Sequence, residues 1–167
     1  AIIDLQFENI NKLLSAFEIV MEQNNYEEVG KIVHALDDLI KNIKIVIDET
    51  PTVILLGKMV IPKKINDIKA TANKMKKDGY NIEYINLDYN IEESEKKIND
   101  IFDRLKILNL SDSIFELKTI LDYFESLFGD FDKERHAKKE YEEYMNSIQN
   151  KLNRLSSVIK NIYEEVS

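Results

Sequence analysis

The chain has 167 residues, and its 31 acidic against 23 basic side chains give a formal net charge of −8. A protein this acidic lacks the basic face that holds phosphates, so we expect no nucleic-acid partner. The absence of cysteine excludes disulfides and thiolate metal sites. Only 4 glycines and 2 prolines leave few of the breaks that sheets and loop-rich enzymes need.

Apolar residues recur at alternating steps of three and four, the spacing of helices packed in a bundle or coiled coil. The pattern predicts a first helix that stops at Asn24-Asn25, a second that stops at residue 50, and further helices over 62–78, 87–108 and about 112–165. Gly79 suits the C-terminal cap of the third helix, and Ser111 suits the N-cap of the fifth. In chain order, the predicted seams are Ile3, Phe7, Ile10, Leu14, Phe17 and Met21; Val29, Ile32, Leu36, Leu39, Ile43 and Val46; Ile65, Ile68, Ala72 and Met75; Ile98, Ile101, Leu105 and Leu108; and Ile114, Leu117, Leu121, Phe124, Phe128 and Phe131, followed by Tyr141, Met145, Ile148, Leu152, Leu155, Ile159 and Ile162.

The segment PTVILLGKMVIP, residues 51–62, holds both prolines of the chain. A strand is disfavoured because no second β segment exists to pair with it, and a membrane dip is disfavoured by its length and by Lys58. We therefore predict a joint between two helical units, with Pro51 in the first turn of a new helix and Pro62 permitting a second restart.

A weak internal repeat supports such units. At an offset of 85 positions, Phe17 pairs with Phe102, Val29 with Ile114, and the turn residue Asn24 with Asn109. A helix-turn-helix that recurs with an intervening helix predicts three helices per unit. Residues 1–50 would then form a partial repeat of two helices, residues 51–135 a complete repeat, and residues 136–167 the first helix of a following, truncated repeat.

Signatures of catalysis are missing. Neither His34 nor His136 has a glutamate three residues before it, so the Glu-x-x-His pattern of di-iron bundles is absent, and both are expected on helix surfaces. No phosphate-binding loop, zinc-protease motif or hydrolase elbow occurs. Acidic pairs such as Glu27-Glu28 fit no calcium loop and are common at helix starts. We predict no enzyme activity, no catalytic or metal-binding residue and no cofactor.

Four stretches, in chain order, resemble an interior part of the EzrA family of septation ring formation regulators: NNYEEVGKIVHALDDLI, IDETP, IPKKINDIKATANKMKKDGYNIEYINLD and LNLSDSIFELKTILDYFESLFGDFDKER. The family pattern is an acidic-Pro pair, a second proline, then Met, Gly-Tyr and a long helix. Here these positions are Pro51, Pro62, Met75, Gly79 and Tyr80. The similarity covers roughly residues 15–145.

The resemblance implies an all-α rod of spectrin-like antiparallel three-helix bundle repeats that share long helices. Such rods lie on the cytoplasmic side of the plasma membrane at the division septum, held by a transmembrane anchor that this sequence lacks. They contact the tubulin-like protein FtsZ and other septal proteins, and restrain ring assembly. This segment would be a spacer and protein-interaction module. The alternative is a generic helical-repeat adaptor or coiled-coil scaffold unrelated to cell division.

The sequence begins without methionine and ends within a helical pattern, so we expect an interior piece of a longer protein. The two incomplete repeats would each expose an apolar seam. A second copy could supply the missing helices by reciprocal or head-to-tail exchange, and a closed two-fold homodimer of the piece is the commoner outcome.

Overall fold

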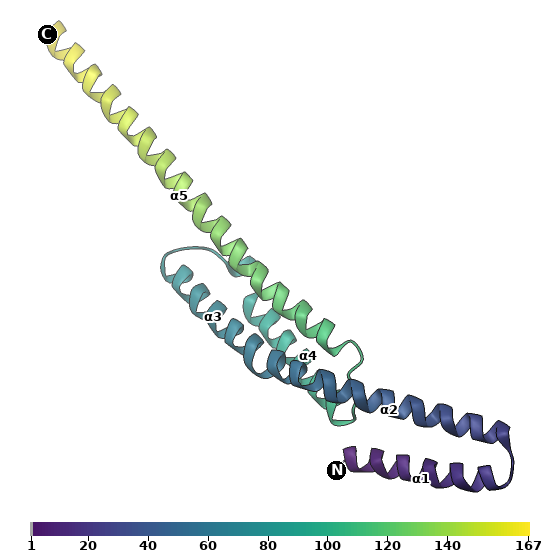
Figure 1. The fold of residues 1–167 in the computed structure, drawn as a ribbon. Coiled ribbons are helices and arrows are strands. Elements are labelled where there is room, and N and C mark those ends of the chain that lie inside the picture. The colour runs from purple at the N-terminus through teal and green to yellow at the C-terminus, as the bar shows by residue number, and fades with distance from the viewer. Residues whose placement is uncertain (1) are drawn as a thin grey trace.

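A computed structural model describes residues 2–167 and confirms the all-α prediction (Figure 1). The helices are α1 (Ile2–Glu22), α2 (Tyr26–Leu55), α3 (Ile61–Lys77), α4 (Leu87–Lys106) and α5 (Ser113–Val166). A π-helical turn, η1 (Leu56–Val60), joins α2 to α3, and a short 3-10 turn, η2 (Glu83–Ile85), precedes α4. These residues contain no strand, and α5 is the long fifth helix that the sequence predicts.

Most turns fall where the sequence places them. Asn24 has a φ of 54°, and the side chain of Asn25 accepts a hydrogen bond from the Glu28 amide at the start of α2. Gly79 has a φ of 83° and follows the end of α3, a conformation that glycine adopts without strain. The predicted cap at Ser111 is wrong, because Asp112 occupies the N-cap of α5 with a φ of 57°. The Ser111 amide instead donates to the side chain of Asn109.

The predicted helix break at Pro51 is also wrong. Pro51 lies inside α2, which continues through η1 into α3 as one uninterrupted helical stretch. A proline removes one backbone hydrogen bond, here the one to the Ile47 carbonyl. Pro51 and Ile47 are both exposed, so water can satisfy that carbonyl, while the buried Val46 and Val53 hold the helix on either side.

The irregularity of this helix lies at η1. The Ile61 amide bonds to the Leu56 carbonyl, five residues back, which widens the turn immediately before Pro62. In a regular α-helix the ring of Pro62 would collide with the Lys58 carbonyl, and the wider turn relieves this clash. Pro62 therefore lies near the start of α3, as predicted, without a break in the chain of helices.

Helices α3, α4 and the first part of α5 pack around one core, with α4 antiparallel to the other two (Figure 1). Of the predicted core residues, Leu105 and Leu121 are only partly buried, whereas the others are fully enclosed. The enclosed ones are Ile68, Met75, Ile101, Leu117 and Phe124.

Helices α1 and α2 form a separate antiparallel hairpin at the opposite end from the C-terminus (Figure 1). Its α2 seam, Val29 to Val46, is half-buried or buried as predicted. The prediction for the α1 seam is partly wrong, because four of its members are 41–52% exposed. They are Ile3, Phe7, Leu14 and Met21. The residues of α1 that are partly buried instead include Leu13 and Val20, beside the predicted Ile10 and Phe17.

Candidate interaction surface

The five residues that carry the predicted motif lie in α2, in α3 and in the turn after α3, and they do not form one cluster. Pro51 and Pro62 flank η1, and Pro51 is exposed. Met75 is 1% exposed in the bundle core near the other end of α3. Gly79 and Tyr80 form the turn after α3, and Tyr80 packs against the core as a partly buried residue. Met75 and Tyr80 thus belong to the bundle core and its closing turn, whereas Pro51 lies on the exposed surface of α2.

Long-range polar contacts close the turn after α3. Lys138 Nζ, on α5, donates to the Asp78 carbonyl at 2.7 Å and lies 4.3 Å from the centroid of the Tyr80 ring. The Tyr84 hydroxyl donates to Glu134 at 2.9 Å. That hydrogen bond, with some burial, raises the pKa of Tyr84 above its ordinary value. Because α5 continues beyond these contacts, they fix the point at which it leaves the bundle.

A second polar cluster holds the other end of the bundle together. The Arg104 guanidinium, on α4, contacts Glu116 of α5 at 2.5 Å and Asp100 at 3.1 Å, and it donates to the Ser111 carbonyl at 3.1 Å. The Glu116 carboxylate is the main cause that raises the pKa of Arg104. A guanidinium can serve three acceptors at once, so this residue fixes the connection between α4 and α5.

Gly57 lets the helix that contains η1 approach α4 closely. It is buried, and a Cβ built on it would lie 2.7 Å from Cε2 and Cζ of Phe102. Lys58 Nζ lies 5.3 Å from the centroid of the same ring. The π turn thus places a backbone without a side chain against an aromatic ring, a contact that the sequence analysis missed. A glycine within an apolar run was the available signal.

Two apolar surfaces remain open among residues 3–167. The first, which we call the exposed hairpin face, combines the four exposed seam residues of α1 named above with Val33, Ile40, Ile47 and Ile54 of α2, all at least 40% exposed. The sequence analysis missed the α2 members, which recur at steps of seven. The second, the outer seam of α5, has mostly exposed side chains at the positions predicted from the sequence. Its members are Tyr141, Met145, Ile148, Leu152, Leu155, Ile159 and Ile162.

The exposed hairpin face lies on one side of the hairpin. Counted at about 100° per residue, the exposed stripe of α1 lies roughly 75° to one side of the face that packs on α2, and the stripe of α2 is displaced by a similar angle in the same rotational sense. Because the two helices are antiparallel, both stripes face the same side.

His34 and His136 are exposed on helix surfaces, as predicted. Within the described part of the chain, no three His, Asp or Glu side chains gather where they could hold a metal ion. No helix within residues 2–167 combines the length and the apolar character needed to cross a membrane. The open surfaces are apolar, and they suit association with other helices.

Comparison with known proteins decides the family. The family model described as "Septation ring formation regulator, EzrA" matches residues 1–167. The chain belongs to the EzrA family. That description is of a regulator and not of an enzyme, in agreement with the prediction from the sequence. The comparison with solved structures gave no significant match.

Curated relatives with the name septation ring formation regulator EzrA match over most of the chain. One from Staphylococcus epidermidis is 26% identical over 138 residues, which cover 83% of this chain and 24% of the relative. One from Halalkalibacterium halodurans is 23% identical over 98% of this chain and 29% of the relative. One from Staphylococcus aureus is 19% identical over 91% of this chain and 27% of the relative. The chain thus spans about a quarter of the length of these relatives.

Proposed function

We propose that this chain is a rod segment of a cell-division regulator, built from spectrin-like three-helix repeats that share helices. The observation that carries the proposal is helix sharing at both ends of the bundle. The bundle continues into the hairpin through α2, η1 and α3, and it continues outward through the 54 residues of α5 (Figure 1). Helices that belong to two units resist bending at the joint, which suits a spacer.

The repeat boundaries follow from this proposal. Residues 1–50 are a partial repeat, residues 51–135 a complete one, and residues 136–167 the first helix of the next. Burial supports the offset of 85 positions: Ile32, Leu39 and Val46 face the inside of the hairpin, and their counterparts Leu117, Phe124 and Phe131 are 0% exposed. The boundary near residue 50 then falls inside a continuous helix, so neighbouring repeats are joined without a flexible linker.

The partners proposed for this segment are FtsZ and other septal proteins, met at the division septum on the cytoplasmic face of the plasma membrane. Family membership supports this proposal. The exposed surface of the bundle is rich in charged side chains, so a partner that binds there would be recognised through polar contacts. The apolar surfaces at the two ends are suited to neighbouring repeats.

Sedimentation of FtsZ polymers tests the interaction role. Polymers assembled with GTP would be pelleted with this chain, and the bound fraction compared with that of a fragment from another part of a full-length relative. Saturable co-sedimentation that requires GTP and exceeds that of the other fragment is the expected result. If both fragments sediment with the polymers only at the background level, this segment does not bind FtsZ and acts as a spacer.

A further inference from the structure

Helix α3 carries a surface whose charge is opposite to that of the rest of the chain. Its 17 residues contain six lysines and one carboxylate, Asp67. Because α3 contributes +5 to the net charge of −8, the rest of the chain carries −13. Five of the six lysines are exposed, and we call them the basic face of α3. They are Lys63, Lys69, Lys74, Lys76 and Lys77.

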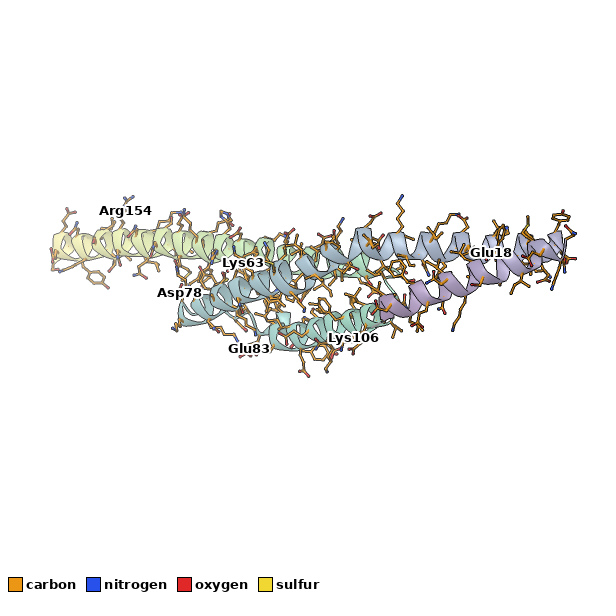
Figure 2. All side chains as sticks on the ribbon, turned by 60° about the horizontal axis from the view of Figure 1, so that its bottom comes forward. Glu18, Lys63, Asp78, Glu83, Lys106 and Arg154 are labelled. Carbon is orange, nitrogen blue, oxygen red and sulfur yellow. The ribbon has the colours of Figure 1, made fainter. Side chains whose placement is uncertain are left out.

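The basic face is centred on the side of α3 that points away from the bundle core. Lys63, Lys74 and Lys77 each follow a buried residue by two positions, and two positions turn a helix by about 200°. Lys63 and Asp78 lie at the two ends of this helix (Figure 2). Neighbouring repeats of the proposed rod would join the bundle at its ends, so they would not cover this side.

The positive charge of the basic face is not neutralised within the fold. Other exposed lysines pair with a carboxylate on their own helix, as Lys41 does with Asp37 at 2.8 Å. Within residues 2–167 the one lysine of α3 in an ion pair is the partly buried Lys64, which contacts Glu125 at 3.7 Å. The helix dipole favours the lysines in the last turn of α3, but it does not account for Lys63 and Lys69, which lie further from that end.

The chemistry of the face selects an acidic protein segment as its partner. No large apolar side chain is exposed between Ile61 and Lys77, so the face lacks a seam on which another helix could pack or that could insert into a bilayer. Helix α4 has six carboxylates against four basic side chains, and residues 113–131 of α5 have four against one. A wide anionic surface such as a membrane is repelled by these carboxylates, whereas a narrow segment can lie along α3 alone.

We propose that the basic face of α3 binds an extended, acidic segment of another protein, an inference that rests on the interaction role proposed above. From Lys63 to Lys77 the face spans about 21 Å along the helix axis. An extended chain covers that length with about six residues. Carboxylates of such a segment pair with the lysines, and the exposed Asp67 is the one carboxylate of α3 that opposes binding.

Charge variants test the face with a defined probe. The probe is a fluorescein-labelled peptide of about eight residues, made of glutamate and serine, and its control has glutamine in place of glutamate. Fluorescence anisotropy at low salt should show saturable binding of the acidic peptide alone. The triple variant Lys63→Gln, Lys74→Gln and Lys77→Gln should weaken this binding about tenfold, because several exposed ion pairs are lost. Asp67→Asn should strengthen it about twofold.

A second triple variant is the matched control. Lys151→Gln, Arg154→Gln and Lys160→Gln remove the same charge from exposed positions of α5, and the affinity for the peptide should change by less than about twofold. All substituted positions are exposed, and circular dichroism would verify the helix content of each variant. Added salt should weaken the binding of the peptide, because ions screen exposed charges.

Other outcomes overturn the proposal. If the unmodified chain does not bind the acidic peptide at low salt, the face has no such partner. If the two triple variants weaken binding equally, net charge and not the face determines the affinity.

Sedimentation with vesicles of phosphatidylserine and phosphatidylcholine in equal parts distinguishes a protein partner from a lipid surface. The unmodified chain should remain in the supernatant. Vesicle binding that the α3 triple variant abolishes would assign the face to an anionic membrane instead. FtsZ is absent from all these measurements, so their failure leaves the FtsZ experiment unaffected.

Discussion

Gly57→Ala probes the contact between the π turn and α4. The added Cβ would lie 2.7 Å from two ring atoms of Phe102 and 3.6 Å from Ile98 Cγ2, so the ring must move by about 1 Å to reach an ordinary contact distance. Overpacking of this kind costs about 1–3 kcal/mol. Replacing glycine by alanine inside a helix returns about 0.5–1 kcal/mol. We expect a net loss of roughly 1 kcal/mol in the free energy of unfolding.

Removing the ring should reverse the sign of this effect. In a Phe102→Ala background nothing opposes the new methyl group at that point, and Gly57→Ala should stabilise by about 0.5–1 kcal/mol. Urea denaturation followed by circular dichroism would measure all four corners of the double-mutant cycle. Gly129→Ala is the control, because a Cβ there meets nothing within 4 Å, and it should stabilise in both backgrounds. A coupling energy near zero between Gly57 and Phe102 would refute the close approach and the role assigned to the glycine.

The remaining predictions concern the bundle and its closing turn. Phe124→Ala should lower the free energy of unfolding by about 3–5 kcal/mol, because the ring is 0% exposed; a loss under 1 kcal/mol would contradict that burial. Gly79→Ala should cost about 1–2 kcal/mol at a φ of 83°, and Gly79→Asn less; equal stability of all three proteins by thermal unfolding would argue against the left-handed turn. Glu134→Gln should lower the pKa of Tyr84 measured by NMR titration, since the carboxylate opposes ionisation of the phenol. The stabilising effect of this bond should be full below the ordinary tyrosine pKa of about 10 and be lost as pH rises through the raised value.

The sequence was sufficient where one physical preference dominates a position. Glycine and asparagine tolerate left-handed backbone, so the turns at Asn24 and Gly79 could be placed to within a residue or two. The apolar positions of α5 recur regularly, so helical periodicity alone predicts that Leu117 and Phe124, seven residues apart, lie on the same buried face. The prediction of no enzyme activity was made from residue types, and it agrees with the description of the family as a regulator.

The wrong predictions concern positions where the sequence is compatible with two structures and only the packing against other helices determines which one forms. Helix α1 has two neighbouring apolar stripes, and only the packing on α2 shows that Leu13 and Val20 face inward while Leu14 and Met21 do not. Proline tolerates a first turn, but at Pro51 solvent exposure and buried neighbours carry the helix through. The approach of Gly57 to Phe102 joins residues far apart in sequence, and no local pattern encodes it.

The π turn also sets how the chain can change in length. Along the continuous helix, the buried residues Val53, Gly57, Ile61 and Ile65 follow one another at steps of four, one residue more than a heptad allows, and the wide turn absorbs that residue. The apolar seams of α2 and of α3 therefore both continue to face the sides on which they are buried. An insertion or deletion elsewhere between Tyr26 and Lys77 would rotate the hairpin by about 100° against the bundle and turn one seam toward water. Length differences among relatives should accordingly gather at this turn or in the loops between helices, because elsewhere each added residue would redirect the whole rod.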